Sequence, residues 1–369
     1  MRIAVTGGGP AGLAFAAFAR LAGPPDEVTV WERRRAEDTY GFGVILPPAA
    51  LDTLRRADPR AADALAPHLA EFDAITVHRH GRSLTTPAPH LGAVSRRTLL
   101  RILRQRCAEL GVRLHQGDPA PGTAALTARF DLVVAADGAR SATRAALAGE
   151  FGTTTERIAP DYIWLGAERA FGGLSFVVAD SPRGPAVAHA YPYGPDRSTV
   201  LVEAAHRPDT RELDRLFAEP LAGARLLKNR SRWSRFLQVR NRTWSSGNVV
   251  LLGDAAHTAH YSIGSGTRLA LDDAHALVTA LRSEPSLGAA LAAYEAARRP
   301  AVEHTQRIGL ASAAWFAGLA DSGDGGGASG MPPERFLVDL LTRGGRISMR
   351  DLAADATGAV PAGTVVSSR

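Results

Sequence analysis

The chain has 369 residues, of which 45% are hydrophobic, which is enough for two domains or for one large domain with an inserted lobe. No segment approaches the ~20 consecutive apolar residues that a membrane-spanning helix needs, and the lone Cys107 excludes an internal disulfide and a cysteine-based metal site. The net charge of +6 comes mainly from scattered arginines, with Lys228 as the single lysine, so we expect no nucleic-acid partner, no membrane partner and no bound metal.

The first residues predict a strand, a glycine turn and a helix, without the pattern of a cleavable signal, so we expect a cytoplasmic protein. Gly7, Gly9 and Gly12 have the G-x-G-x-x-G spacing, and Pro10 and Ala11 lie between the last two. In this motif the first glycine allows a tight turn, the second lets a pyrophosphate approach the backbone, and the third lets the helix pack on the strand.

A second strand, residues 28–31, ends at Glu32, about twenty positions after the glycines, where dinucleotide-binding proteins carry an acidic residue. A carboxylate at this point binds ribose hydroxyls and repels a 2′-phosphate. The sequence therefore predicts a site for an unphosphorylated ADP moiety. Arg33 is either a contact to adenine or phosphate, or a solvated surface arginine.

The segments that follow are less specific. Residues 41–47 are either a loop against a flat aromatic ring or a packed turn, residues 51–69 have helical spacing, and residues 75–83 alternate like a strand that leaves the nucleotide domain. Ser95 is a suitable N-cap for a helix that continues to Gly111, so Arg96 is either a phosphate contact or plain surface charge.

A buried strand at residues 130–136 ends in Asp137-Gly138, and Ser141 can cap the helix that follows. Residues 162–166, 174–178, 186–193 and 198–203 then read as strands with hairpin-like spacing. They predict an antiparallel sheet inserted as a second lobe, whose apolar side can wall a substrate cavity.

Residues 249–252 predict another buried strand, which ends at Gly253-Asp254 and leads through Gly264, Gly266 and Thr267 into a helix at 268–281. The glycines let backbone amides approach a planar or phosphorylated ligand. His257 is expected to brace this turn. Beyond it we predict helices to about residue 319 with a break at Pro300, a flexible linker at 323–330, a helix at 332–345 and a loose tail from about 353.

Three motifs now stand in order: the glycines with Glu32, Asp137-Gly138 with Ser141 and Arg144, and Gly253 to His257. Together they closely resemble the single-component FAD-dependent aromatic hydroxylases built like p-hydroxybenzoate hydroxylase. Residues 162–166, 188–191 and 259–267 resemble the subgroup with salicylyl-CoA 5-hydroxylase, the flavin domain of anthraniloyl-CoA monooxygenase and the indole-oxidising enzymes of the violacein pathway. Where the wider family carries a proline-containing loop, this chain has His260, Tyr261 and Arg268, which favours the subgroup over enzymes of simple phenols.

The resemblance implies an α/β fold with a Rossmann-like FAD-binding domain, an inserted antiparallel-sheet substrate lobe and a C-terminal helical segment. We place the FAD-binding domain at residues 1–72, 93–158 and 240–285. The sheet lobe takes residues 73–92 and 159–239, and the C-terminal region takes residues 286–369.

The resemblance also implies the residues that hold FAD. Amides near Gly9 and Gly12 hold the pyrophosphate, Glu32 the adenosine ribose, and Arg96 the FAD chain. Asp254 binds the ribityl or pyrophosphate part, and Gly266 and Thr267 offer amides to the pyrimidine edge of the flavin. The full set of cofactor-binding candidates is Gly7, Gly9, Pro10, Ala11, Gly12, Glu32, Arg33, Arg96, Asp137, Asp254, Gly264, Gly266 and Thr267.

Family behaviour implies that NADH or NADPH docks transiently and reduces FAD, and that O2 then gives a C4a-hydroperoxyflavin that attacks an electron-rich ring. The expected substrate is an aromatic or indolic acid or thioester, with a CoA thioester as one form, in secondary metabolism or aromatic breakdown. His189, His260 and Tyr261 are the candidates for proton handling, since imidazole titrates near neutrality. For His189 the alternative is a hydrogen-bonded sheet residue, and for Tyr261 a packing aromatic.

Other functions remain open at this stage. The same fold can open an indole ring after epoxidation, and a non-oxygenating FAD oxidoreductase or a nucleotide-binding protein without turnover are further classes. A flavin halogenase would carry a W-x-W-x-I-P segment and a lysine near the flavin, and the sequence has neither. We expect a monomer or a homodimer.

Overall fold

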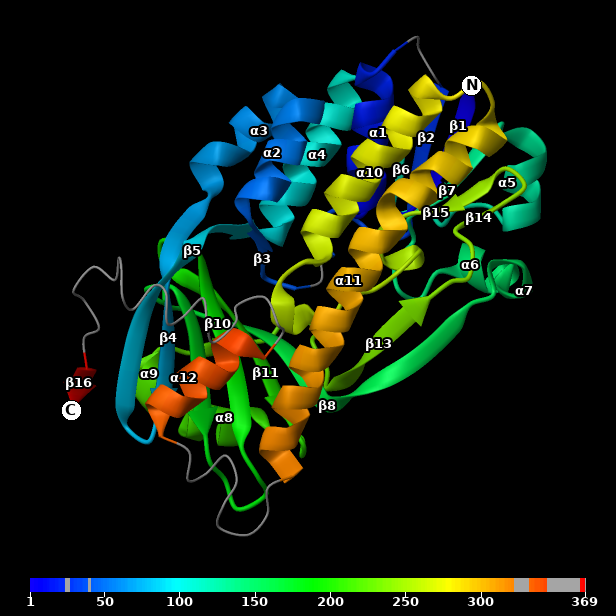
Figure 1. Cartoon of the computed structure of the whole chain (residues 1–369). Helices are drawn as coiled ribbons and strands as arrows, with labels where there is room; N and C mark the ends of the chain where they lie inside the picture. Colours follow the sequence, from blue (N-terminus) through cyan, green and yellow to red (C-terminus); the bar gives the residue numbers. More distant parts are fainter. Residues whose placement is uncertain (24–26, 39–40, 322–331, 344–365, 369) are drawn as a thin grey trace, which may run out of the picture.

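The computed structural model describes residues 1–23, 27–38, 41–321, 332–343 and 366–368. The chain is built on two sheets, one in the upper and one in the lower part of the molecule, and helix α11 runs along both (Figure 1). Among the described residues, no helix combines the length and the apolarity needed to cross a lipid bilayer.

The first sheet has six strands in the order β14-β15-β7-β1-β2-β6. All neighbours are parallel except β14, which pairs antiparallel with β15. Parallel strands bring their carboxyl ends to one edge, where open α/β sheets bind ligands. The strands are β1 (Arg2–Thr6), β2 (Glu27–Glu32), β6 (Arg113–Gln116), β7 (Leu132–Ala135), β14 (Ser245–Ser246) and β15 (Val249–Leu251).

Three long helices cover one face of this sheet, with α1 (Pro10–Leu21) in contact with both α4 (Arg96–Glu109) and α10 (Gly266–Ser283) (Figure 1). Small residues allow the close packing: residues 11–19 of α1 are all buried, and most are alanines or glycine. The remaining helices near this sheet are α2 (Pro48–Ala57), α3 (Pro59–Leu65), η1 (Ala66–His68), α5 (Thr123–Arg129), α6 (Ala142–Ala146) and α7 (Ala148–Phe151).

The second sheet has ten strands, in the order β12-β8-β11-β10-β9-β4-β5-β16, with β13 paired to β8 and β3 paired to β5. Its pairs are antiparallel except β4 with β9. The strands are β3 (Gly43–Leu46), β4 (Ala70–Arg79), β5 (Arg82–Ser95), β8 (Thr154–Ala167), β9 (Leu174–Ala179), β10 (Ala186–Gly194), β11 (Arg197–Ala204), β12 (Leu226–Leu227), β13 (Ser234–Arg240) and β16 (Val366–Ser368).

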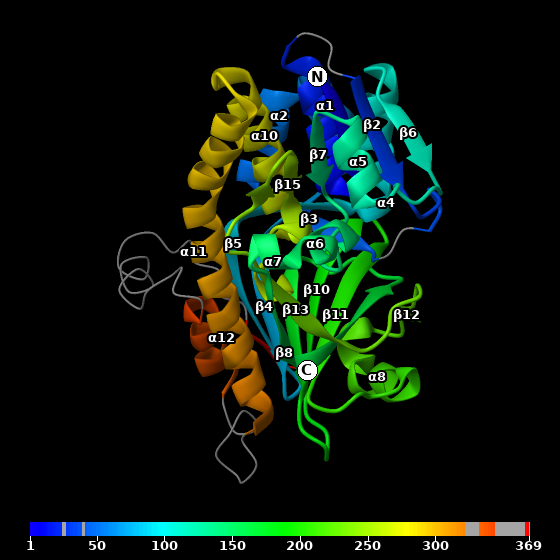
Figure 2. The same cartoon turned by 90° about the vertical axis from the view of Figure 1, so that its right-hand side faces the viewer.

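Two helices lie against one face of the second sheet, namely α11 (Leu287–Asp321) and α12 (Pro333–Thr342) (Figures 1 and 2). Phe316 of α11 and Phe336 and Leu340 of α12 form one apolar cluster with Phe176 and Val187 of the sheet. The other short elements are α8 (Thr210–Leu216), α9 (Ala218–Leu221), η2 (Gly253–Ala255) and η3 (Tyr261–Ile263).

Several local predictions need correction. The strand predicted at residues 75–83 is a hairpin, because His80 and Gly81 both adopt positive φ and turn the chain between β4 and β5. The helix predicted at residues 51–69 is divided at Asp58, whose side chain caps α3 ahead of Pro59. The open question at residues 41–47 is resolved as strand β3, which pairs with β5.

Pro300 does not break the C-terminal helix, because α11 continues through it to Asp321. Tyr294 and Val302 are buried on either side of the proline, and Arg299 donates hydrogen bonds to the carbonyls of Asn241 and Arg242. These contacts hold both halves in line at the cost of one helical hydrogen bond.

The linker predicted at residues 323–330 lies outside the described residues, as does the tail except for β16. That strand pairs with β5, contrary to the prediction of a loose tail at those positions. The helix predicted at residues 332–345 is α12. The predicted domain boundaries stay a prediction.

Candidate active site

The three sequence motifs meet at the carboxyl edge of the first sheet. A Cβ added at Gly7 would lie 2.3 Å from the carbonyl oxygen of Ala136, so the turns after β1 and β7 touch. A Cβ added at Gly253 would lie 2.9 Å from the Cβ of Ala11, in the first turn of α1. Segments more than 100 residues apart therefore form one cleft.

Arg144 links the motif that begins at Asp137 to the motif that begins at Gly253. Its guanidinium donates hydrogen bonds to the carbonyl of Ala255, at 2.8 Å, and to that of Ala139, at 2.6 Å. The side chain is buried, and burial lowers the pKa of the guanidinium against the opposing effect of Asp137 and Asp254. The sequence places Arg144 within a motif but does not show that it bridges to the turn of η2.

The helix α1 begins with free amides that face an open space. Gly9 is the N-cap residue, and no side chain caps this end of the helix. A Cβ at Gly9 would meet nothing within 4 Å, whereas one at Gly12 would lie 2.1 Å from the carbonyl oxygen of Gly7. Gly12 is thus required for packing, and the hollow over Gly9 is free for an anion at the positive end of the helix.

Glu32 lies at the end of β2, next to the glycine turn. Its carboxylate accepts a hydrogen bond from the amide of Gly8 at 2.9 Å and another from the amide of Arg34 at 2.9 Å. Arg33 is exposed beyond it. Arg104 of α4, which the sequence did not single out, also lies near Glu32. Burial lowers the pKa of the Arg104 guanidinium, and the Glu32 carboxylate offsets part of this effect.

Asp254 is exposed to solvent in the turn η2. Desolvation by the neighbouring chain raises the pKa of its carboxyl, against the opposing effect of His257 and Arg96. Arg96 begins α4, and its amide donates a hydrogen bond to the carbonyl of Phe42. Both Asp254 and Arg96 therefore border the cleft.

His257 lies behind Asp254 in a buried polar cluster. Its Nε2 is 2.8 Å from a carboxylate oxygen of Asp273, whose other oxygen accepts a hydrogen bond from Arg298 at 2.8 Å. The pKa of Asp273 is lowered because these two partners outweigh the effect of its burial. This arrangement fits the prediction that His257 braces the turn and does not face a ligand.

The two carboxylate oxygens of Asp137 differ in their contacts. Oδ2 accepts hydrogen bonds from the amides of Ala142 and Thr143, at 2.9 and 3.1 Å, and Ser141 caps the same helix. Oδ1 is buried and has no hydrogen-bond partner among the described residues. Asp137 therefore stabilises the turn after β7, and its place among the cofactor-binding residues stays a prediction.

The far end of the cleft is the turn that carries Gly264 at φ 61° into α10, which begins at Gly266. Thr267 follows in the first helical turn, so the amides at this helix start face outward without a side-chain cap. Gly264 and Ser265 also line a cavity of about 440 Å³. The turn therefore joins the nucleotide cleft to this cavity.

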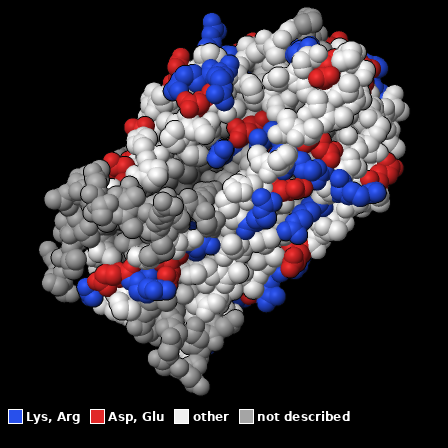
Figure 3. Space-filling view, viewed as in Figure 1, with Lys and Arg blue, Asp and Glu red and all other residues white. Residues whose placement is uncertain are grey.

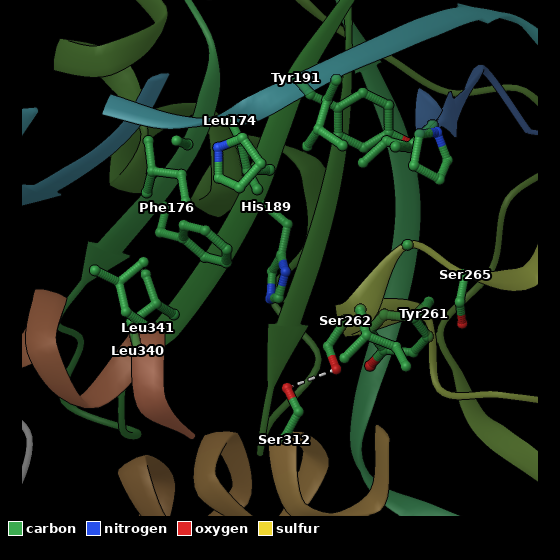
Figure 4. Close-up of a pocket in the computed structure, with 18 of the residues that line it drawn as sticks. Leu174, Phe176, His189, Tyr191, Tyr261, Ser262, Ser265, Ser312, Leu340 and Leu341 are labelled. Carbon is green, nitrogen blue, oxygen red and sulfur yellow. Dashed lines mark hydrogen bonds between the residues drawn. The ribbon is translucent and has the colours of Figure 1, made fainter. Parts of the chain in front are cut away.

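The cavity lies between the second sheet and the helices that cover it. Its sheet wall carries Leu174, Phe176, His189 and Tyr191, and its opposite wall carries Ser312 of α11 with Leu340 and Leu341 at the end of α12 (Figure 4). Most of the lining is apolar, and the size suits one small ligand.

Of the candidates for proton handling, His189 and Tyr261 line the cavity and His260 does not. His260 is 1% exposed, and burial lowers its pKa to about 4, so it is neutral near pH 7. Its Nδ1 lies 2.8 Å from Ser262 Oγ, and Ser262 donates a hydrogen bond to Ser312 across the cavity wall (Figure 4). His260 thus supports the wall from behind.

Burial raises the pKa of Tyr261 well above its ordinary value, and the nearby Glu203 carboxylate adds to this effect. Its ring packs against Tyr162 and His260, with centroids 4.4 and 4.0 Å away. Tyr261 therefore packs as an aromatic residue whose hydroxyl is buried and protonated, and its part in proton handling stays a prediction.

Two polar residues of this region escaped sequence reasoning. Arg343, directly after α12, lines the cavity and donates a hydrogen bond to Ser312 at 2.9 Å. Glu203 of β11 is buried beside His189, with 3.0 Å between Oε1 and Nε2. Neither lies in a recognisable motif, and only the alternation of β11, which places Glu203 on the same face as Leu201, hinted at its orientation.

On the face in Figure 3, basic and acidic side chains of the described residues are interspersed, and along α11 Arg299 is paired with both Glu295 and Glu303.

Comparisons with known proteins agree with this geometry. A family model described as an FAD binding domain matches residues 1–308. The chain is 62% identical over 363 residues to the 3-hydroxy-4-methyl-anthranilyl-[aryl-carrier protein] 5-monooxygenase of Streptosporangium sibiricum, covering 98% of this chain and 99% of that protein. It is 39% identical to the salicyloyl-CoA 5-hydroxylase of a Streptomyces species, covering 96% of this chain and 72% of that protein. It is 30% identical to the protodeoxyviolaceinate monooxygenase of Chromobacterium violaceum, covering 86% and 89%.

Solved structures show the same fold. A 2-methyl-3-hydroxypyridine-5-carboxylic acid oxygenase aligns with a TM-score of 0.74 at 22% identity, over 88% of this chain and 93% of that one. A probable FAD-dependent monooxygenase from Pseudomonas aeruginosa aligns with a TM-score of 0.68 at 22% identity, over 93% and 100%. The expected fold class and FAD as cofactor are confirmed, and the chain belongs to the FAD-binding-domain family as an FAD-dependent aromatic monooxygenase.

Proposed function

We propose that this protein uses NADH or NADPH and O2 to hydroxylate a 2-amino- or 2-hydroxybenzoyl thioester at ring carbon 5. The names of two relatives, at 62% and 39% identity, support this substrate class. Both place oxygenation at carbon 5, which is para to the amino group of an anthranilyl ring or to the hydroxyl group of a salicyloyl ring. The amino or hydroxyl group at position 2 donates electron density to the ring, which makes carbon 5 electron-rich.

The observation that carries the proposal is the cavity of about 440 Å³ that opens from the Gly264 turn. Its volume accommodates one aromatic acyl group. A CoA or carrier-protein arm is far larger, so we infer that the thioester arm extends out of the cavity.

The residues of the cleft fit FAD. The hollow over Gly9 at the start of α1 receives the pyrophosphate and Glu32 the adenosine ribose, while Asp137 holds the neighbouring turn through the amides of Ala142 and Thr143. Asp254 and Arg96 border the middle of the cofactor, and the amides at the start of α10, near Gly266 and Thr267, face the flavin ring. Bound FAD supplies hydride acceptance from the nicotinamide and activation of O2.

The protein's own contribution is position, dryness and proton handling. Apolar side chains such as Leu174, Phe176 and Leu340 exclude water from the ring, which protects reactive oxygen species from side reactions. Arg343 presents a cation at the cavity wall, where it can hold the thioester carbonyl or a ring oxygen. His189 and Tyr261 are the polar groups available to the position-2 substituent.

The test compares salicyloyl-CoA and anthraniloyl-CoA with free salicylate and with an indolic acid. We expect oxygen-dependent NAD(P)H oxidation and a product heavier by one oxygen atom for at least one thioester, at a kcat/KM at least about tenfold above the free acids. Turnover of the indolic acid alone would favour the violacein-pathway type of reaction, for which the 30% identical relative is the precedent. NAD(P)H oxidation by any substrate without oxygen uptake would contradict the proposal and indicate a dehydrogenase.

A further inference from the structure

Glu203 is a buried carboxylate that the chemistry above does not use. It is 2% exposed, and the imidazole of His189 and the hydroxyl of Tyr261 lie beside its oxygens. Taking a carboxylate out of water costs several kcal/mol in general even when polar groups face it, so its retention calls for a role.

His189 is the group that faces this carboxylate. In the antiparallel pairing of β10 and β11, His189 lies opposite Leu201, which puts Glu203 diagonally across on the same face of the sheet. Its Nε2 is 3.0 Å from Glu203 Oε1, which is ion-pair distance, although the two groups are not aligned as a good hydrogen bond. His189 also lines the substrate cavity, so the pair extends from the cavity into the protein.

Glu203 borders a second, smaller hollow on its other side. This hollow of about 10 Å³ is lined by Glu203, Ala205 and Pro160 together with Phe316 and Leu319 of α11, and it shares no lining residue with the substrate cavity. Its size is at the lower limit for one water molecule. His189 and Glu203 thus span the distance between the two hollows.

We propose that His189 and Glu203 form a proton relay, in which Glu203 receives through His189 the proton that the substrate's position-2 hydroxyl or amino group releases. The relay leads from the substrate cavity to the smaller hollow. This inference rests on the proposed function, which supplies the oxidant and the ring substituent.

Atoms and protons balance over the whole step. While the C–O bond forms at carbon 5, the O–O bond of the reduced dioxygen that bound FAD would supply breaks and leaves its second oxygen with the cofactor. The O–H or N–H bond at position 2 gives its electron pair to the ring and its proton to His189 Nδ1, and His189 passes a proton from Nε2 to the Glu203 carboxylate. The C–H bond of carbon 5 then breaks, its electron pair restores the aromatic ring, and its proton neutralises the oxygen left with the cofactor. The position-2 group regains its proton from Glu203 through His189, so that no net proton is released.

Other charged or titratable groups face the pair from neighbouring elements. They are Tyr261 of η3, His260 before it, Tyr162 and Asp161 of β8, and Arg343 after α12. Tyr261 stays protonated because burial and Glu203 raise its pKa, and His260 stays neutral because burial lowers its pKa to about 4. Asp161 is held by Arg207 and Arg235.

The test uses the holoenzyme with Glu203→Gln, which keeps the shape of the side chain and removes its ionisation. Glu168→Gln is the control, since it makes the same change at a carboxylate just after β8 that is paired with Arg197 at the surface and lines neither hollow. With salicyloyl-CoA, or anthraniloyl-CoA if that is the better substrate, we expect Glu203→Gln to lower kcat by about 10- to 100-fold while KM changes less than about twofold. The control should keep the wild-type kcat and pH profile.

A second readout needs no turnover. A thioester blocked at carbon 5, 5-nitrosalicyloyl-CoA, changes its absorption when its phenol ionises, so the ionisation of the bound probe can be titrated directly. We expect the apparent pKa of the bound phenol to fall by at least about one unit in Glu203→Gln, because the variant removes a neighbouring negative charge, and to stay unchanged in Glu168→Gln. A Glu203 that is not coupled to the substrate through His189 would leave this titration unmoved.

The outcomes separate the two proposals. Failure of wild-type enzyme to oxygenate either thioester contradicts the proposed function, whereas an unchanged pH profile and probe titration in Glu203→Gln overturn the relay. If Glu203→Gln folds poorly, the test uses His189→Gln and the double variant His189→Gln with Glu203→Asp. If the two residues act as one relay, the double variant has the same kcat as His189→Gln alone. Additive losses would reject the relay.

Discussion

Single glycines of the first turn have separable roles in packing and in binding. Gly12 is closed in by the backbone of Gly7, whereas Gly9 has extended backbone geometry and open space beyond its Cα. The motif assigns the approach of a pyrophosphate to the second glycine and helix packing to the third, and the space around each Cα agrees with this division.

We predict that Gly12→Ala lowers the free energy of unfolding of the FAD-free protein by about 1–3 kcal/mol, because the new methyl overlaps a carbonyl oxygen. Gly9→Ala should leave the melting temperature of the FAD-free protein unchanged and weaken FAD binding by about tenfold or more, which is at least ~1.4 kcal/mol. Thermal unfolding and FAD titration measure the two effects. Equal behaviour of the two variants would show that the hollow over Gly9 does not receive the cofactor.

His260 gives a residue-scale prediction about pH. Its pKa in the folded protein is about 4 and its ordinary value is 6.5, so the unfolded chain binds more protons between these values and stability falls as pH drops from 6.5 to 4. We expect His260→Asn to reduce the drop in the free energy of unfolding between pH 6.5 and pH 4 by up to about 3 kcal/mol. Urea unfolding at several pH values measures it, with the exposed His304→Asn as control. A curve as steep as that of the wild type would mean that His260 is not buried as described.

At the scale of elements, α11 shows how packing overrides a local rule. Pro300 has no amide hydrogen to donate to the carbonyl of Ala296, and an isolated helix would end or bend there. Tyr294 and Val302 hold the helix against the rest of the protein on either side, so it continues across both sheets.

Because Pro300 is exposed, its replacement by alanine should restore one helical hydrogen bond without a packing penalty. We predict that Pro300→Ala raises the free energy of unfolding by about 1–3 kcal/mol, with catalytic activity unchanged. Ala297→Gly, one turn earlier and also exposed, should lower it by about 1 kcal/mol. Denaturant unfolding decides, and a less stable Pro300→Ala would indicate that the proline is needed for the path of α11.

At the scale of the whole molecule, the cofactor cleft and the substrate cavity are built differently. The cleft uses one edge of one sheet, where turns after β1, β7 and β15 meet. The cavity takes walls from β9, β10, η3, α11 and α12, which span most of the chain. A substitution in one wall of the cavity can therefore change which substrate binds without affecting FAD binding.

The sequence by itself determined the fold class, the family and the cofactor, because glycine spacing, strand ends and acidic positions are local features that fix a dinucleotide cleft. Only the tertiary structure decided which side chains meet at the cavity. The position of Glu203 behind His189 depends on the register of β10 against β11, and Leu340, Leu341 and Arg343 reach the cavity through the docking of α12. Such contacts arise from the packing of distant segments, which no local pattern of residues encodes.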